Sequence, residues 1–206
     1  MWAGIALKKI LIAGEAGQTT NYENALAAMQ VHFVTSLQVK DVDEYDGLLL
    51  PGGGDVDPKL FGQLLIPETE IRQYSRWEQQ LIRKGQEKLT PELDRIQLAI
   101  LKAFCQYRKP VFGICKGMQL INIAFGGDML RHLPTAVHHA YREKDQMHPA
   151  RNEVNSFLYE VYGSDMLVNS AHHQGVGIPG RGIRYVQYAP DGVVEGLQHE
   201  FLPVYG

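Results

Sequence analysis

The sequence has few cysteines, no large excess of charge and no long apolar run. Only Cys105 and Cys115 occur among 206 residues, which argues against a disulfide framework and favours a reducing cytoplasm. Twenty basic and 23 acidic residues give a net charge of -3, which excludes the basic surface of a nucleic-acid-binding protein. No apolar run reaches the roughly 18 residues that span a bilayer, and the N-terminal lysines lie inside an apolar stretch, so neither a membrane span nor a signal peptide is expected.

Strand-like and helix-like segments alternate through the first part of the chain. Compact apolar or β-branched runs predict strands within 8–14, 31–36, 45–55 and 109–114. Helical spacing predicts a helix over 21–30, with Asn21 as its cap and Met29 on its apolar face, and two helices within 76–104, the second starting at Thr90-Pro91. This order favours a parallel sheet covered by helices on both faces.

The pattern changes after about residue 135. Segments 165–170, 183–189 and 192–200 are strand-like, and Asp191-Gly192 predicts a hairpin between the last two. A short helix within 154–163 is expected to close at Gly163. The stretch 137–152 is rich in histidine and charge, and we expect a mobile surface loop there. Cys105 falls in a helical pattern and is predicted to be buried packing.

The stretch "PVFGICKGMQLINIAFGG" (110–127) places Cys115 between an apolar run and a helical pattern. A strand–turn–helix corner needs small neighbours, which gives Gly113 and Gly117 a steric purpose. A thiol at a helix N-terminus gains from the dipole and the free N–H groups, so we expect a lowered pKa and an oxyanion donor at the Lys116 amide. A buried structural cysteine explains this motif equally well when it is taken alone.

The stretch "LLLPGGGDVDP" (48–58) shifts that balance. Glycines there let the backbone approach a ligand, and Gly52 or Gly53 is predicted to supply a second oxyanion donor. A flexible turn is the alternative interpretation. In a parallel sheet, however, both corners lie at the C-terminal ends of strands, where open α/β sheets bind their ligands.

Four segments in the same order carry a family resemblance: "PGGGDVDP", "KPVFGICKGMQLINIAFGG", "VNSAHHQGV" (168–176) and "APDGVVEGLQH" (189–199). Together they resemble the class I glutamine amidotransferase superfamily and, within it, the γ-glutamyl-γ-aminobutyrate hydrolase branch of cysteine peptidases. The resemblance covers most of the chain from about residue 8. It implies a flavodoxin-like three-layer α/β sandwich, with a mostly parallel central sheet, helices on both faces and a small antiparallel extension. We expect residues 1–206 to form a single domain of this kind that lacks its extreme C-terminal segment.

The resemblance also implies an activity, namely hydrolysis of γ-glutamyl amides through a γ-glutamyl thioester. Cys115 matches the nucleophile, Gly53 and Lys116 match the oxyanion donors, and Gln119 matches a contact to the glutamyl part of the substrate. The expected partner is a small γ-glutamyl molecule, and no metal or organic cofactor is expected. The sequence leaves the oligomeric state open, with a homodimer as one expectation.

The catalytic base is the open point of the sequence. His172 and His173 follow a strand and are predicted to reach the site; with Gln174 they match a segment that forms the active-site wall. His32 is predicted to be structural and His199 a surface residue. We expect three further histidines to be solvated loop residues, too loosely spaced for a metal site: His138, His139 and His148.

The family's base lies in a His-Pro-Glu motif that follows a strand resembling "FLPVYG", and the given sequence stops at Gly206. We therefore expect a truncated chain. The alternative is a protein that lacks the base. Two other functions are alternatives to the hydrolase: a glutaminase subunit that delivers ammonia to a partner synthetase or, if the chain truly ends at Gly206, a binding module without catalytic activity.

Overall fold

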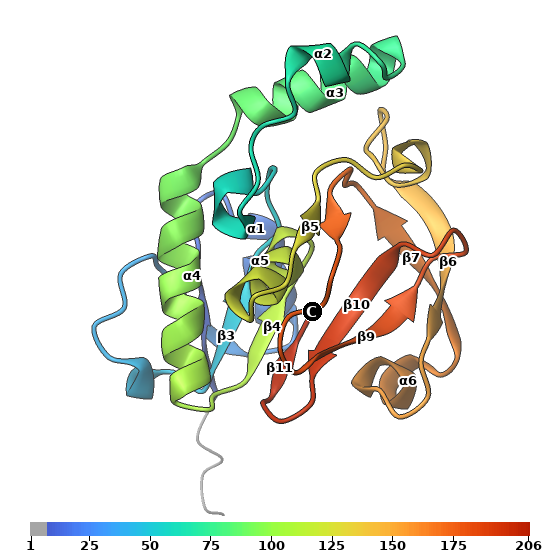
Figure 1. The fold of residues 1–206 in the computed structure, drawn as a ribbon. Helices are drawn as coiled ribbons and strands as arrows, with labels where there is room; N and C mark the ends of the chain where they lie inside the picture. Colours follow the sequence, from blue (N-terminus) through green and yellow to red (C-terminus); the bar gives the residue numbers. More distant parts are fainter. Residues whose placement is uncertain (1–7) are drawn as a thin grey trace, which may run out of the picture.

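A nine-stranded sheet forms the centre of the molecule in the computed structural model, which describes residues 8–206 (Figure 1). Residues 1–7, which form the start of the N-terminal apolar stretch, lie outside the described residues. One half of the sheet is parallel and has the order β2-β1-β3-β4-β11. Its strands are β1 (Lys9–Ile12), β2 (His32–Thr35), β3 (Gly47–Leu50), β4 (Val111–Gly113) and β11 (Val204–Tyr205). Strand β3 is buried along its whole length, as expected of a central parallel strand.

The other half of the sheet is antiparallel and continues from β11 in the order β10-β9-β6-β7. Its strands are β10 (Val194–His199), β9 (Ile183–Tyr188), β6 (Gln146–Asn152) and β7 (Asp165–Ser170). A separate two-stranded sheet joins β5 (Met129–Leu130) to β8 (Gly175–Val176). The predicted α/β class with a parallel sheet and an antiparallel extension is confirmed, and the hairpin at Asp191-Gly192 forms as expected.

Strand β6 corrects the prediction of a mobile loop over 137–152. Its residues pair with β7 from Gln146 to Arg151 and with β9 at its end. The segment "QMHPARN" has no apolar alternation, so its sequence does not indicate a strand. Backbone hydrogen bonds to β7 on one side and to β9 on the other hold this segment as a strand. Its residues Ala150 and Asn152 turn inward and are buried.

The helices and short 3₁₀ turns connect these strands. They are α1 (Thr20–Ala28), α2 (Glu68–Ile71), α3 (Arg76–Glu87), α4 (Pro91–Gln106), α5 (Lys116–Ala124), α6 (Phe157–Tyr162), η1 (Val42–Glu44), η2 (Pro58–Phe61) and η3 (Ala136–His138). Helices α4 and α5 pack against each other and against β3 and β4, while α2 and α3 project beyond the sheet (Figure 1). Among residues 8–206, no helix is both long and apolar enough to cross a membrane.

Helix α1 differs in detail from its prediction. Thr19 rather than Asn21 precedes its first turn, and Met29 is 63% exposed instead of covered. Helix α1 packs against β2, which is an edge strand. Because few neighbours lie there, only a small part of the apolar face of α1 is covered. Tyr22 and Leu26 are its half-buried apolar residues.

The main core lies between the pair α4–α5 and the parallel strands. Phe104 and Leu101 of α4 are fully buried there, together with Leu120 and Ile121 of α5 and Leu50 of β3. Because this core fixes α5 against β3 and β4, the C-terminal ends of the two strands lie side by side. The two glycine-rich corners predicted from the sequence follow those strand ends.

Candidate active site

Cys115 occupies a strained corner between β4 and α5. Its backbone has φ +52° and ψ -107°, a conformation that residues other than glycine rarely adopt. The corner is held on both sides, because Ile114 N donates to Leu50 O at 3.0 Å and Gly117 N donates to Ile114 O at 2.9 Å. Such an outlier costs about 1–3 kcal/mol and persists where the surrounding structure enforces it, most often at functional sites.

The glycines around Cys115 have the predicted steric purpose. A Cβ at Gly113 would lie 2.5 Å from the carbonyl carbon of Gly117, and a Cβ at Gly117 would lie 2.3 Å from Leu50 O. Both obstacles are backbone atoms, which cannot rotate away. The spacing G-x-C-x-G therefore reflects close approach of α5 to β3 and β4.

The thiol of Cys115 does not have the lowered pKa that its position suggests. Burial raises the pKa of the thiol above its ordinary value, and the negative charges of Glu195 and Asp55 act in the same direction. The backbone N–H groups of Lys116 and Gly53 face the sulfur and lower the pKa, but they do not outweigh burial. The helix N-terminus favours the thiolate, but desolvation and the two carboxylates, which the local sequence does not reveal, act against it.

The glycine-rich loop after β3 brings only one of its two candidate amides to the thiol. The N–H of Gly53 faces Cys115, whereas the N–H of Gly52 donates to the hydroxyl of Tyr22 at 2.8 Å. Gly52 still lies close, since a Cβ there would be 3.4 Å from Cys115 Cβ. Of the two glycines predicted as possible oxyanion donors, Gly53 is therefore the one whose N–H remains available at the thiol.

A buried ion pair ties this loop to the two core helices. The ammonium of Lys116, at the start of α5, contacts the carboxylate of Asp94 on α4, and both side chains are almost fully buried. The same carboxylate accepts a hydrogen bond from Asp57 N at 3.0 Å. Lys116 thus places its amide toward the thiol while its side chain points away and anchors α4, α5 and the loop together.

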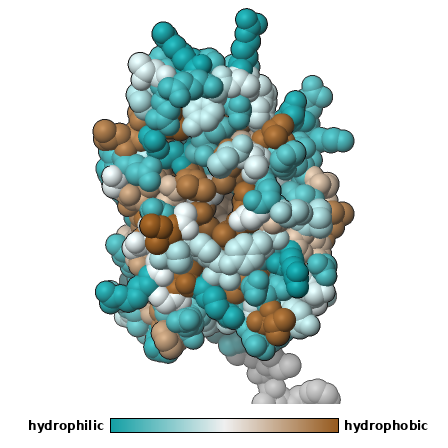
Figure 2. Space-filling view, turned by 45° about the vertical axis from the view of Figure 1, so that its right-hand side comes forward, coloured by the Kyte–Doolittle hydropathy of each residue, from teal (hydrophilic) through white to brown (hydrophobic). Residues whose placement is uncertain are grey.

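A cavity of about 730 Å³ opens in front of Cys115. Its polar lining holds most of the residues singled out in the sequence: Gly52, Gly53, Cys115, Gln119, His172 and Gln174. Apolar side chains from β4, α6 and β7 line the rest, among them Phe112, Phe157, Val161 and Met166. Figure 2 shows hydrophobic side chains gathered around the middle of one face of the molecule and ringed by hydrophilic ones.

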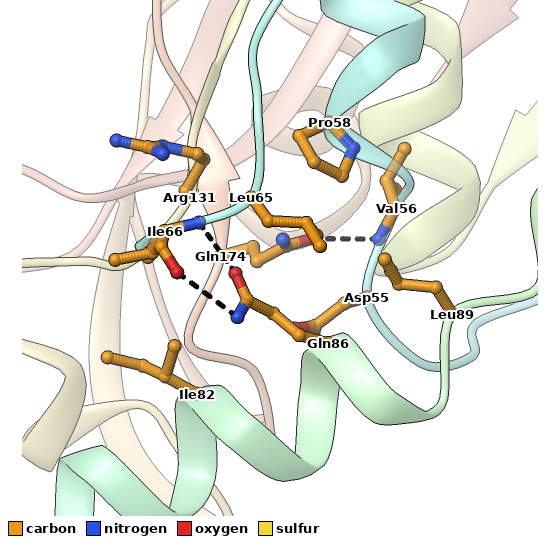
Figure 3. Close-up of a pocket in the computed structure, with 10 residues that line it drawn as sticks. All are labelled: Asp55, Val56, Pro58, Leu65, Ile66, Ile82, Gln86, Leu89, Arg131 and Gln174. Carbon is orange, nitrogen blue, oxygen red and sulfur yellow. Dashed lines mark hydrogen bonds between the residues drawn. The ribbon is translucent and has the colours of Figure 1, made fainter. Parts of the chain in front are cut away.

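Gln119 and Gln174 form the buried floor of this cavity. Gln119 Nε2 donates to Gln174 O at 3.2 Å, and Gln174 Oε1 accepts from Val56 N at 2.8 Å (Figure 3). Beneath them, toward α3, lies a space of about 10 Å³, which holds at most about one water molecule. Gln119 is 4% exposed, so its side chain belongs to the buried lining of the cavity and not to the outer surface.

His173 is turned away from the cavity although it follows His172 directly. Its Nε2 lies 3.0 Å from the carboxylate of Asp55, and its Nδ1 lies 3.0 Å from Nδ1 of His132. His132 in turn contacts Glu78 of α3 at 3.3 Å. This buried chain joins the glycine-rich loop to α3, which makes His173 a support of the loop rather than part of the cavity lining.

Three histidines gather around Glu195, a residue that the sequence argument did not single out. His139, His148 and His172 have ring nitrogens 3.0, 3.5 and 3.3 Å from its carboxylate oxygens. His139 is 1% exposed, so the prediction of a solvated loop residue is wrong there. Burial raises the pKa of Glu195, but the imidazoles of His139 and His172 outweigh burial and hold it at about 2. The sequence holds one indication that Glu195 is functional, because it is an acidic residue within the otherwise apolar strand "VEGL".

Two other histidines also differ from expectation. His32 is exposed rather than structural, and His199 is half-buried against Phe125 rather than a free surface residue. Within residues 8–206, no hydrogen bond joins a histidine ring to the thiol of Cys115, and both ring nitrogens of His172 are occupied by Gln174 O and Glu195.

The sequence model of the Peptidase C26 family matches residues 75–206, which include the cysteine corner, Gln119, His172 and Glu195. The chain belongs to the Peptidase C26 family. Protein NtpR of Enterococcus hirae is 28% identical over 166 residues, which cover 76% of this chain and 62% of NtpR. The γ-glutamyl-γ-aminobutyrate hydrolase PuuD of Escherichia coli K12 is 28% identical over 178 residues, 79% of this chain and 61% of PuuD.

This Peptidase C26 chain therefore spans about three fifths of the length of these curated relatives. A glutamine amidotransferase from Thermotoga maritima shares its fold, with a TM-score of 0.63 over 97% of this chain and 74% of the other, at 12% identity. The family and the fold thus agree with the resemblance seen in the sequence.

Proposed function

We propose that this protein is a cysteine-dependent hydrolase of γ-glutamyl amides with Cys115 as its nucleophile. The observation that carries the proposal is the strained corner: φ +52° at Cys115, with the amides of Gly53 and Lys116 facing the sulfur inside a cavity. A cysteine that only fills space needs neither the strain nor the two aligned donors. The relative of this family that is named a γ-glutamyl-γ-aminobutyrate hydrolase supports the choice of substrate class.

In this proposal the sulfur of Cys115 attacks the γ-carbonyl carbon, and the carbonyl electrons move onto oxygen. The N–H groups of Gly53 and Lys116 hold that oxyanion, which is the interaction that strengthens most in the transition state. The C–N bond then breaks, and the amine leaves with a proton. Water attacks the resulting γ-glutamyl thioester, which releases glutamate and restores the thiol.

The cavity supplies separate surfaces for the two parts of such a substrate. Gln119 is buried beside Cys115 and offers an amide to the α-amino or α-carboxylate group of the glutamyl part. His172 and Gln174 form the wall beside it. The apolar lining of Phe112 and Phe157 suits the alkyl part of the departing amine.

The raised pKa of Cys115 means that attack needs a base to take the thiol proton. The family resemblance places this base in a His-Pro-Glu motif after the last strand. Strand β11 runs parallel to β4, and Gly206, directly after it, lines the cavity. The end of β11 therefore lies at the cavity, where the resemblance places the base. We also propose that the described residues form one domain, because a single sheet contains the first strand, β1, the last strand, β11, and all others except β5 and β8.

The test measures glutamate release from γ-glutamyl-aminobutyrate, a γ-glutamyl polyamine and glutamine, with the protein at its natural length. We expect release from a γ-glutamyl amide, complete loss in Cys115→Ser, and full activity in Cys105→Ser, which removes the other thiol. Equal release by the parent and Cys115→Ser would refute the proposal.

Glutamine distinguishes the second candidate, a glutaminase that delivers ammonia to a synthetase. Several relatives carry the name glutamine amidotransferase-like protein, which supports this candidate. Hydrolysis of glutamine alone, rising when a co-purified synthetase is added, would favour it.

A further inference from the structure

We propose that His139, His172 and Glu195, with His148 as a fourth donor, form a binding site for a divalent transition-metal ion of the zinc class. The potential ligand atoms of the first three residues all lie within 4.8 Å of one another. Imidazole and carboxylate groups are ligands that zinc and its neighbours accept, and four donors match the coordination number common for zinc. This site goes beyond the proposed hydrolase activity and does not depend on it.

The spacing of the donors fits ligands that share one small ion. The carboxylate of Glu195 lies 3.0 Å from His139 Nδ1, 3.3 Å from His172 Nε2 and 3.5 Å from His148 Nε2. Two ligands at zinc bond lengths are about 3.3 Å apart when the ion lies between them in tetrahedral geometry. The His172 and His148 distances exceed the about 2.7–2.9 Å of a charge-assisted hydrogen bond, whereas the His139 distance also suits a hydrogen bond.

The outer nitrogen of each histidine already has an acceptor. His139 Nε2 lies 2.9 Å from Asp191 Oδ2, His172 Nδ1 lies 2.9 Å from Gln174 O, and His148 Nδ1 lies 3.0 Å from Pro149 O. Each outer nitrogen can therefore direct a hydrogen to its own acceptor. The inner nitrogens can then offer their lone pairs to a bound ion, whereas without an ion they can donate to Glu195. Metal-binding histidines almost always have this second contact, which fixes the ring and its tautomer.

Two buried atoms at the centre of the cluster, Glu195 Oε1 and His148 Nε2, have no hydrogen bond of good geometry among the described residues. Their near neighbours are each other, at 3.5 Å, and His139 Nδ1, which lies 3.0 Å from Glu195 Oε1. His139 Nδ1 has one further neighbour, the hydroxyl of Ser170 at 3.4 Å. Buried polar atoms without partners are costly, and a bound cation would satisfy both of them at once.

An ion can reach the cluster from either side. His139 and His148 line a cavity of about 430 Å³ near Met147 and Asp191, while His172 and Glu195 line the cavity of Cys115. The cluster thus forms the wall between two openings. The four donors come from the end of η3, strand β6, the β7–β8 connection and strand β10, so an ion would join segments that are distant in the sequence.

The test begins with the chelator-treated protein, titrated with Zn²⁺ by calorimetry and with Co²⁺ by visible absorption. We expect saturation at one ion per chain and the d–d bands of bound cobalt. A 100-fold excess of Zn²⁺ over its Kd should raise the melting temperature by about 5–10 °C.

The variants assign the ligands. His172→Ala, His139→Ala and Glu195→Gln should each weaken zinc binding at least tenfold, and Asp191→Asn, which only orients His139, should weaken it by about 10–100-fold. His32→Ala removes an exposed histidine far from the cluster and should leave the affinity unchanged. Circular dichroism checks that each variant is folded, and Asp191→Asn remains informative if a ligand variant is not.

Several results would overturn the proposal. One is the absence of saturable binding, which would leave protonated imidazoles around Glu195 as the explanation of the cluster. Another is equal affinity in His172→Ala and His32→Ala. Loss of binding in Cys115→Ser would place the ion on the thiol instead. Since none of these measurements uses enzymatic turnover, failure of the metal site and failure of the hydrolase proposal are separate outcomes.

Discussion

Replacement of Gly117 by alanine tests whether close contact between α5 and β3 builds the cysteine corner. The added carbon would lie 2.3 Å from Leu50 O and 2.8 Å from Leu50 Cβ, against about 3.5–4.0 Å for a favourable carbon contact. Since β3 is buried on all sides, relief requires the start of α5 to move by about 1 Å. Overpacking of this kind costs up to about 3 kcal/mol, and the better helix propensity of alanine returns about 1 kcal/mol.

We therefore expect Gly117→Ala to lower the free energy of unfolding by about 2 kcal/mol and the melting temperature by about 4–8 °C. Thermal and urea denaturation followed by circular dichroism measure both quantities. Gly54→Ala is the matched control, because a Cβ there meets no atom within 4 Å, and its change should stay within about 0.5 kcal/mol. Equal stability of the two variants would refute the steric argument. The same shift displaces the Lys116 amide from Cys115, so activity should fall by about 100-fold.

Three further predictions concern the surroundings of the thiol. Asp94→Asn keeps an acceptor for the backbone N–H of Asp57 but leaves the Lys116 ammonium buried without its counter-charge. The free energy of unfolding, measured by urea denaturation, should therefore fall by about 3–5 kcal/mol. A loss as small as that on breaking an exposed ion pair would contradict the burial of this pair. Burial raises the pKa of the Cys115 thiol, so the thiolate appears only as pH rises through a value above the ordinary one. In a Cys105→Ser background, iodoacetamide should then react slowly at pH 7 and faster with increasing pH, and a midpoint below that of an exposed cysteine would be the contrary result. Tyr22→Phe removes the acceptor of the Gly52 N–H and should cost about 1 kcal/mol, measured by thermal denaturation against the parent; no change would show that this contact does not hold the loop.

The cysteine corner could be predicted because its determinants are local. Gly113 and Gly117 flank Cys115 in the sequence, and their steric function follows from the strand–turn–helix geometry alone. Parallel strands place their C-terminal ends together, so the glycine-rich loop could be expected near Cys115. Strand geometry alone did not separate Gly52 from Gly53, because the bond of the Gly52 N–H to Tyr22 joins distant segments. The thiol pKa could not be predicted, because it depends on burial and on carboxylates from distant segments.

The histidine cluster shows more clearly which features cannot be predicted from the sequence. Spacing within 138–148 gives no metal pattern, because the remaining partners, His172 and Glu195, come from elements far along the chain. They meet only once β6 joins the sheet between β9 and β7. That strand has no apolar alternation, so neither the strand nor the cluster that it helps to build is visible in the sequence.

Covalent labelling tests most directly that Cys115 is a nucleophile that recognises a γ-glutamyl group. A glutamate analogue with a diazo ketone in place of the γ-amide alkylates a suitably placed thiol without need of a leaving amine. Peptide mass spectrometry should find one label per chain on Cys115, none on Cys105, and protection by excess glutamate. Labelling of both cysteines without protection, or no labelling at all, would contradict the account.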